Sequence, residues 1–367
     1  MVEFAMAYGA GDRPDGLVSA CAAQLTEHGG RYDLAFVYTT DSLADDLDGI
    51  IAGLKQRTEI DDWFGTVGVG VCVTGQACFS GPAIAVLACN LDGAGYRKIT
   101  TPSSLGRFEQ GSTQEFMAGL GVVHGDPRNP EVAAIVEQLA DDNGLYLVGG
   151  LSAGEHALPQ VAGAINEGGV TGVQLGAGLN VTVGLTQGCN PIGPAHTVTR
   201  GEHNILAQLD DSSAFEMLCE DLGVADGVDP RPWLGNVHAA VLVAGSDTGD
   251  YLVRNLIGLD PSNGLVAIAE EVEAGDRIMF VRRDAESAAK DVARMLEEMK
   301  SRSSAPPKGA LYYSCVARGP NLFDEDSFEL RAIQDVFGDI PLVGFFGNGE
   351  ISNNRIYGYT GVLTLFS

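Results

Sequence analysis

The stretch Pro341-Leu-Val-Gly-Phe-Phe-Gly-Asn-Gly-Glu350-Ile351 is an apolar run that ends in a glycine-rich turn with one carboxylate. Upstream, Gly309-Ala-Leu-Tyr-Tyr-Ser-Cys315-Val-Ala-Arg318-Gly is a second apolar run that ends in reactive side chains. Between them, the segment from Asp326 to Phe337 has the pattern of a helix. Two such runs joined by a helix predict a strand–helix–strand crossover, whose strand ends meet at one edge of a sheet. We expect four side chains to converge there: Cys315, Arg318, Asn348 and Glu350.

The glycine-rich turn offers groups that suit an amino-acid-like ligand. The segment Gly347-Asn348-Gly349 can turn sharply and present backbone N–H groups in a concave nest for a carboxylate. Glu350 would hold a ligand amine, and Arg318 is suited to bidentate carboxylate recognition. The alternatives are a tight β-turn with a solvated glutamate, and an ion pair of Arg318 with Glu329 or Asp335.

The seven cysteines form no Cys-x-x-Cys pair, and the six histidines complete no zinc spacing. Cys315 would be a nucleophile if Arg318 or a backbone nest lowered the pKa of its thiol. Cys189 lies in a Gly-Cys-Asn-Pro turn, where it could line a pocket. Both are candidates for a catalytic thiol, and a small packing thiol is the alternative for Cys315. Cys72 and Cys89 lie within apolar runs and are expected to be buried.

A repeat relates distant parts of the chain. Leu147-Val-Gly-Gly-Leu-Ser-Ala-Gly-Glu155 aligns without a gap with Leu342-Val-Gly-Phe-Phe-Gly-Asn-Gly-Glu350, and Val67-Gly-Val-Gly-Val-Cys-Val-Thr-Gly75 is a degenerate third copy. Repetition predicts duplicated β-α-β-β units. We expect an α/β fold of mixed β-sheets with helices on the outer faces, and two sheets packed face to face are one such arrangement. Glu155 becomes a second candidate for holding a cationic group.

Other patterns complete the expected organisation. Residues 92–128 are rich in Gly, Pro, Ser and Thr, which predicts a long surface connection. Two apolar runs, at 170–175 and 181–185, predict a hairpin, and four short runs between 239 and 281 predict an antiparallel meander. A chain of 367 residues is long for one core, so we expect two domains, residues 1–195 and 196–367.

The composition excludes several classes of partner. A net charge of −27 argues against nucleic acid and against an anionic membrane surface. No apolar run is long enough to span a bilayer, and the N-terminal residues lack the basic and apolar regions of a signal peptide. We therefore expect a cytoplasmic, acidic protein. A high-salt cytoplasm and a GC-rich genome both explain the acidity and the scarcity of lysine.

The motifs resemble a known family. Cys315-Val-Ala-Arg-Gly, the stretch 341–351 and Tyr357-Gly-Tyr-Thr resemble the FIST C domain. Val148-Gly-Gly-Leu-Ser-Ala-Gly-Glu and Thr186-Gln-Gly-Cys-Asn-Pro-Ile-Gly-Pro are similar to the FIST N domain and its junction, so the likeness covers roughly residues 30–360. The resemblance implies a sensory module for small ligands, proposed to include amino acids. Because relatives are fused to signalling output domains, a stand-alone chain implies a separate signalling partner protein. One branch of the family binds haem and senses nitric oxide.

The first hypothesis is a ligand-binding sensory protein in signal transduction, without a cofactor, whose pocket lies between the two halves. Arg318 and the 347–349 nest would hold an anionic group, Glu350 and Glu155 a cationic group, and Cys315 and Cys189 would line the wall. The second hypothesis is a thiol-dependent hydrolase or transferase that uses Cys315 or Cys189. The third is a haem-based nitric oxide sensor, with one of five scattered histidines as the iron ligand: His124, His156, His196, His203 or His238. A homo-oligomer is compatible with each hypothesis.

Overall fold

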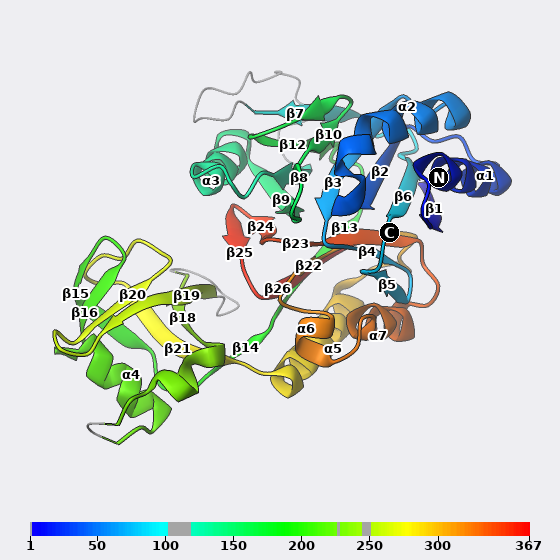
Figure 1. Ribbon diagram of the computed structural model, residues 1–367. Helices are drawn as coiled ribbons and strands as arrows, with labels where there is room; N and C mark the ends of the chain where they lie inside the picture. Colours follow the sequence, from blue (N-terminus) through cyan, green and yellow to red (C-terminus); the bar gives the residue numbers. More distant parts are fainter. Residues whose placement is uncertain (1, 102–118, 226–227, 244–250) are drawn as a thin grey trace. The chain divides into compact units, whose positions relative to one another are not determined.

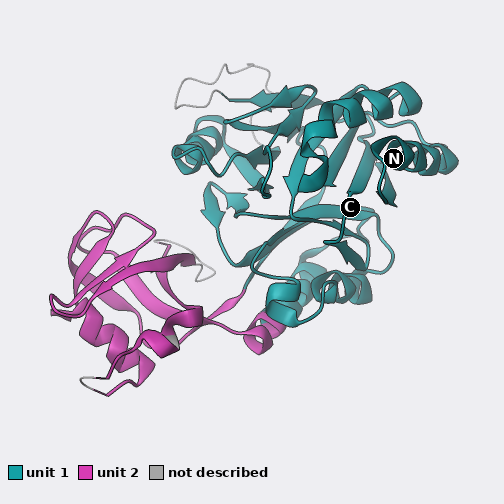
Figure 2. Ribbon diagram, in the orientation of Figure 1, with its two compact units in different colours: residues 1–187, 291–367 teal, residues 188–290 magenta. Residues whose placement is uncertain are grey.

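The computed structural model describes residues 2–101, 119–225, 228–243 and 251–367, without the side chain of Trp233. The chain forms two compact units (Figure 2). Unit 1 comprises residues 1–187 and 291–367, and unit 2 comprises residues 188–290. The boundary expected at residue 195 separates two sequence domains, which are not the same as these compact units, and it stays a prediction.

Unit 1 is built from three repeats with the same order of strands (Figure 1). The first contains β1 (Glu3–Ala10), α1 (Pro14–His28), β2 (Leu34–Thr40), η1 (Asp41–Asp46), α2 (Leu47–Thr58), β3 (Asp62–Gly68), β4 (Gly70–Val73), β5 (Gln76–Cys78) and β6 (Ala83–Asn90). The second contains β7 (Tyr96–Thr100), β8 (Gly119–Gly125), α3 (Val132–Asn143), β9 (Leu145–Leu151), β10 (Gln160–Ala162), β11 (Ile165–Asn166) and β12 (Val170–Leu175). The third contains β13 (Val181–Gln187), α5 (Ala285–Arg302), β22 (Gly309–Cys315), α6 (Pro320–Phe323), α7 (Phe328–Phe337), β23 (Leu342–Gly347), β24 (Glu350–Asn353), β25 (Arg355–Tyr357) and β26 (Thr360–Phe366).

Each repeat passes one hairpin to the sheet of another repeat. The three sheets have the orders β1-β6-β2-β3-β10-β11, β7-β12-β8-β9-β24-β25 and β13-β26-β22-β23-β4-β5. The first repeat thus gives β4–β5 to the third sheet, the third gives β24–β25 to the second, and the second gives β10–β11 to the first. In each sheet the strand–helix–strand pair is parallel and its neighbours are antiparallel. This cyclic exchange gives unit 1 approximate three-fold symmetry.

One glycine marks the same place in each repeat. Gly65, Gly149 and Gly344 lie opposite Val37, Val123 and Tyr312 on the adjacent parallel strand. A Cβ atom at any of the three would overlap the backbone carbonyl of that partner residue. The three strands therefore approach their neighbours in a way that only glycine permits. By this register, the segment of the first structural repeat that corresponds to residues 147–155 and 342–350 begins at Trp63. The alignment of sequences alone had placed its beginning at Val67.

The inner faces of the three sheets pack into one apolar core. Strands from all three repeats contribute to it, among them β2, β8 and β22. On the outer faces, α1 and α2 cover the first sheet, α3 covers the second, and α5 and α7 cover the third. The expected mixed sheets with outer helices are confirmed. The β-α-β-β repeat occurs three times, whereas the sequence showed only two copies clearly.

Two expected connections have different structures. Within residues 92–128 the chain forms β7 and β8, while residues 102–118 lie outside the described residues. The expected hairpin at 170–185 does not form, because β12 and β13 belong to different sheets. β12 pairs with β8 and β7, whereas β13 pairs with β26. The two strands are neighbours in sequence but end one repeat and begin the next.

Unit 2 is an antiparallel barrel inserted into the third repeat. Its elements are β14 (Cys189–Pro191), β15 (His196–Glu202), β16 (Ile205–Leu209), β17 (Ser212–Ser213), α4 (Ala214–Leu222), η3 (Arg231–Asn236), β18 (Val237–Leu242), β19 (Tyr251–Asp260), β20 (Leu265–Ile268) and β21 (Arg277–Arg283). The order is β14-β21-β15-β16-β20-β19-β18, and β18 also pairs with β21, which closes the ring. The expected meander is present in β18–β19–β20. The insertion falls between β13 and α5, where the first repeat has the short link from β1 to α1.

Candidate ligand site at the strand ends of unit 1

The carboxyl ends of β22 and β23 lie side by side. Cys315 ends β22 and is the register partner of Gly347, which ends the parallel strand β23. Glu350 then begins β24, which crosses to the second sheet and pairs with Gly150 of β9. The expected strand–helix–strand crossover is therefore present, and ligands of open α/β sheets bind at such strand ends.

Arg318 is buried and paired with a glutamate from α7. Its Nε and Nη2 atoms lie 2.8 and 2.7 Å from Oε1 of Glu329, and Nη1 donates to the carbonyl of Tyr359 at 3.1 Å. The same carboxylate accepts hydrogen bonds from the hydroxyls of Tyr312 at 2.6 Å and Ser314 at 3.0 Å. The structure thus has the ion pair with Glu329 that was the alternative for Arg318. The role of Arg318 as a carboxylate receptor stays a prediction, and the pair demands that a ligand compete with Glu329.

Glu350 is a buried carboxyl group with one unused oxygen. Its side chain has no exposed surface, and Oε2 accepts hydrogen bonds from Oγ1 of Thr360 at 2.6 Å and from its backbone N–H at 3.3 Å. Oε1 has no hydrogen-bond partner among the described residues. Burial raises the pKa of Glu350 to about 8, although Thr360 and Arg318 lower it. At neutral pH the group is therefore mostly a neutral acid that can donate one hydrogen bond.

Cys315 has a thiol that stays protonated. Its side chain is 7% exposed. Burial and the carboxyl of Glu350 raise its pKa to about 12, against the opposing effect of the backbone N–H groups of Ala317 and Tyr359. A protonated thiol is a poor nucleophile. The geometry thus favours Cys315 as part of a wall over Cys315 as a catalytic residue.

One N–H group of the expected anion nest is already engaged in a backbone hydrogen bond, and the turn makes a second bond through a carbonyl. The N–H of Asn348 donates to the carbonyl of Leu151 at 3.1 Å, and the N–H of Leu151 donates to the carbonyl of Gly349 at 2.8 Å. Asn348 has an exposed side chain, and Gly349 has a φ of 128°, which favours glycine. The turn therefore fastens the third repeat to the second, and its role in binding a carboxylate stays a prediction.

Glu155 does not occupy the sheet position of Glu350. It lies exposed in the loop after β9, where its backbone N–H donates to Oδ2 of Asp41 at 3.0 Å. Strand register shows that the counterpart of Glu350 is instead Gln160, which begins β10 and pairs with β3 as Glu350 pairs with β9. The sequence repeat aligns the two glutamates because the second repeat has additional residues between β9 and β10.

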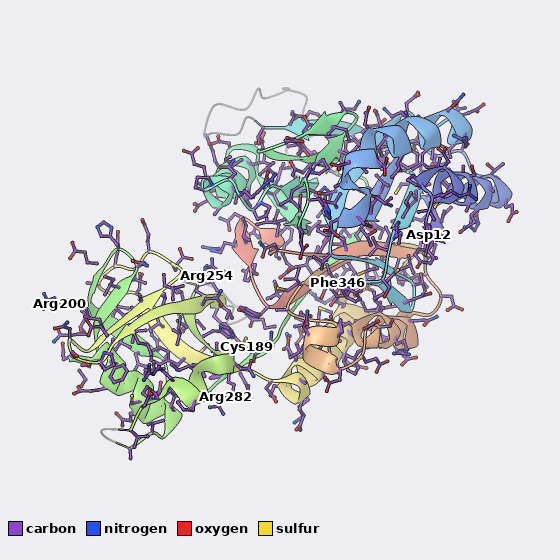
Figure 3. All side chains as sticks on the ribbon, in the orientation of Figure 1. Asp12, Cys189, Arg200, Arg254, Arg282 and Phe346 are labelled. Carbon is purple, nitrogen blue, oxygen red and sulfur yellow. The ribbon has the colours of Figure 1, made fainter. Side chains whose placement is uncertain are left out.

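Cys189 belongs to unit 2, whereas the other candidate residues belong to unit 1. It begins β14 (Figure 3) and is buried. Its carbonyl accepts a hydrogen bond from the hydroxyl of Tyr251 at 2.5 Å. Phe346, which is labelled in the same view, lies on β23, one residue before the end of that strand. The role of Cys189 in a ligand site stays a prediction.

Sequence reasoning missed a polar group at the centre of unit 1. Tyr38, His124 and Tyr313 hold equivalent positions on β2, β8 and β22, one residue beyond the partners of the marker glycines. The hydroxyl of Tyr38 lies 3.1 Å from Nε2 of His124 and 2.8 Å from the hydroxyl of Tyr313. All three are buried, and burial lowers the pKa of His124 to about 3, so its ring is neutral. Only an alignment of all three repeats would have placed these residues together.

Three of the five candidate haem ligands make side-chain contacts in the structure: His124, His156 and His196. His124 is enclosed in the core beside Tyr38, and both ring nitrogens of His196 contact aspartates, Asp210 at 2.7 Å and Asp221 at 3.0 Å. An axial histidine needs one nitrogen that faces the iron, whereas both nitrogens of His196 are already engaged. The haem-sensor hypothesis stays a prediction. His156 contacts Asp41 at 3.3 Å. Among the described residues, no group of three or more His, Cys, Asp or Glu side chains is arranged to hold a metal ion.

Comparison with known proteins identifies similar sequences over the whole chain. The family model of the FIST N domain matches residues 33–212, and that of the FIST C domain matches residues 214–353. An uncharacterized protein of Mycobacterium tuberculosis (strain H37Rv) is 28% identical over 379 aligned residues, which cover 98% of each chain. An uncharacterized protein of Mycobacterium bovis is 32% identical over 209 residues, which cover 54% of this chain and 53% of the relative. Among the described residues, no helix is long and apolar enough to cross a membrane.

Proposed function

Because the chain belongs to the FIST family, whose domains are sensory and bind small ligands, we propose that it is the receptor component of a signalling system and binds an amine-bearing metabolite such as an amino acid. The site is at the strand ends of unit 1, and Glu350 receives the amine. The signal passes to a separate partner protein, and the protein acts in the cytoplasm.

The observation that carries this proposal is the unused oxygen of Glu350. A buried polar atom without a partner costs free energy, typically about 1–3 kcal/mol for a group whose hydrogen bond is missing. A ligand N–H group directed at Oε1 would remove that cost. Asn348, two residues before Glu350 in the same turn, has an exposed side chain.

The protonation state of Glu350 gives ligand binding a measurable signature. An ammonium group favours the ionised carboxylate, so binding lowers the pKa of Glu350 from about 8. At pH 7 the free protein holds a proton there, and the complex does not. Binding of a protonated amine therefore releases nearly one proton to the buffer, whereas a ligand that binds elsewhere releases none.

Isothermal titration calorimetry with an amino-acid series tests this proposal. The measurement is made at pH 7 in buffers of different ionisation enthalpy, which reports the number of protons released. Glu350→Gln should abolish proton release and weaken amine-bearing ligands about ten-fold or more. Glu137→Gln is the matched control, because Glu137 is an exposed carboxylate on α3 of the same unit. A ligand that binds Glu350→Gln and the natural protein equally, with no proton released, would refute the assignment of Glu350.

A further inference from the structure

A groove lies at the opposite end of the strands from Glu350. It has a volume of about 500 Å³ and lies at the start of β8 and β9, the end of β12 and the start of β13. Its lining is mostly apolar: Leu120, Tyr146, Leu175, Leu179, Val181 and Val183. Volumes of this size hold small organic ligands. The candidate ligand site around Cys315, Arg318 and Glu350 lies at the carboxyl ends of β22 and β23. The groove lies at the starts of β8 and β9, so it is a separate location within unit 1.

The three-fold repeat shows what the groove lacks. Phe4, Tyr96 and Val181 are equivalent by strand register. Each lies at the first or second position of β1, β7 or β13 and pairs with a residue of the next strand. That residue in turn pairs with the first or second residue of β2, β8 or β22. Phe4 and Tyr96 are aromatic, and each packs against the sheet of another repeat. Val181 is the only small side chain of the three.

The two aromatic residues fill their repeat interfaces. Phe4 stacks on Phe366 with ring centroids 5.2 Å apart, and its ring occupies the space beside Gly309. Tyr96 contacts Phe64 edge to face at 6.4 Å, and its hydroxyl donates to Asp62 at 2.7 Å. At the third interface, valine replaces an aromatic ring, and the unfilled space is the groove.

One charged residue lines this apolar groove. Arg302, near the end of α5, donates from Nη2 to the carbonyl of Val183 at 2.9 Å. A guanidinium has five N–H donors, so this bond leaves it able to pair with a carboxylate. A cation in the groove is notable in a chain with a net charge of −27, which otherwise repels anions.

We propose that the groove binds a small organic monocarboxylate. The apolar body of the ligand takes the place of the missing aromatic ring, between Leu120, Leu175 and Val181. Its carboxylate pairs with Arg302. Both an aliphatic acid of medium length and an aryl acid have this chemistry, and the experiment separates them.

The test measures binding of octanoate and of 3-phenylpropionate by calorimetry, with octanol and 3-phenylpropanol as uncharged analogues. The natural protein should bind one or both acids more tightly than the corresponding alcohol, and the tighter acid identifies the aliphatic or aryl class. Val181→Phe should restore the ring found at the other two interfaces, abolish binding and raise the melting temperature. Arg302→Gln should weaken the acids about ten-fold and leave the alcohols unchanged.

Arg294→Gln is the matched control for charge. Arg294 also lies on α5 and reaches the carbonyl of Leu185 on β13, but it does not line the groove. Glu350→Gln should also leave octanoate binding unchanged, so that failure of the strand-end site and failure of the groove are distinguishable. Absence of binding of both acids at millimolar concentration would overturn the proposal, as would full binding by Val181→Phe. If Val181→Phe fails to fold, Arg302→Gln still decides, because it needs no repacking of the core.

Discussion

Substitution of Glu329 tests whether the buried cluster around Arg318 is structural. Glu329→Gln keeps the size of the side chain but leaves the guanidinium of Arg318 without its anion in a site where both residues are almost fully buried. The hydroxyls of Tyr312 and Ser314 also lose a charged acceptor. Breaking a buried ion pair by removing one partner costs about 3–5 kcal/mol. That loss is a large part of the stability of an ordinary domain.

Urea unfolding at pH 7 measures this loss. In a Trp233→Phe background, Trp63 is the only tryptophan of the chain, and it is buried in unit 1 beneath α1 and α2. Its fluorescence therefore reports on the unit that contains the cluster. Glu325→Gln provides the control, since Glu325 forms an exposed ion pair with Arg331 and should cost less than about 1 kcal/mol.

A loss below about 1 kcal/mol for Glu329→Gln would refute the reasoning. It would mean that Arg318 finds another partner, and that its guanidinium can be released to a ligand. The double substitution Arg318→Met with Glu329→Leu adds a second test. Removing both charges should recover much of the stability, because an apolar pair leaves no buried charge.

Three further predictions concern titration and reactivity. Because the pKa of Glu350 rises from its ordinary value to about 8 on folding, its protonation favours the folded state below the unfolded pKa, and this contribution is lost as pH rises towards 8; Glu350→Gln should flatten that part of the pH dependence of urea midpoints. Iodoacetamide followed by mass spectrometry should modify the half-buried Cys78 and Cys219 faster than Cys315, whose thiol is buried and protonated. Burial lowers the pKa of His196, but the opposing effect of its two aspartates is larger, so the pKa is raised above its ordinary value. The protonated ring therefore stabilises unit 2, and this stabilisation is lost as pH rises through the raised pKa. His196→Gln should remove this pH dependence, as measured by hydrogen exchange in β15.

The sequence predicted those parts of the fold that rest on local patterns. The crossover from β22 through α7 to β23 follows from two apolar runs and an amphipathic helix, and the structure confirms it. β8 was missed because three of its seven residues are glycine, which is typical of loops. Here the glycines allow close packing: a Cβ atom at Gly121 would overlap Leu147 of the neighbouring strand.

The candidate site was predicted in position but not in detail. Cys315, Arg318 and Glu350 follow strand ends, so their region could be derived from spacing. Their burial could not be derived, because β24 pairs with β9, a strand about two hundred residues away in sequence. No local pattern contains such a non-local pairing. The same exchange of hairpins explains why Glu155 and Glu350 match in sequence but differ in environment.

The three-fold repeat also bears on whether Glu350 is needed for folding. Strand register places Val71, Gln160 and Glu350 at the same position, the residue paired one step beyond the marker-glycine pair. All three side chains are fully buried. The scaffold therefore accepts an apolar side chain, an amide and an acid at one place, so an acid is not a requirement of the architecture.

This equivalence predicts the outcome of replacing Glu350. Glu350→Gln introduces the side chain that the second repeat already carries, and it keeps an acceptor for the hydroxyl of Thr360. The variant should fold and unfold at a urea midpoint at or above that of the natural protein at pH 8, where the buried carboxylate begins to ionise. A large loss of stability at that pH would identify Glu350 as a structural residue that the third repeat requires. An unchanged or higher midpoint, together with lost binding of amines, would show that the acid is kept for its ligand.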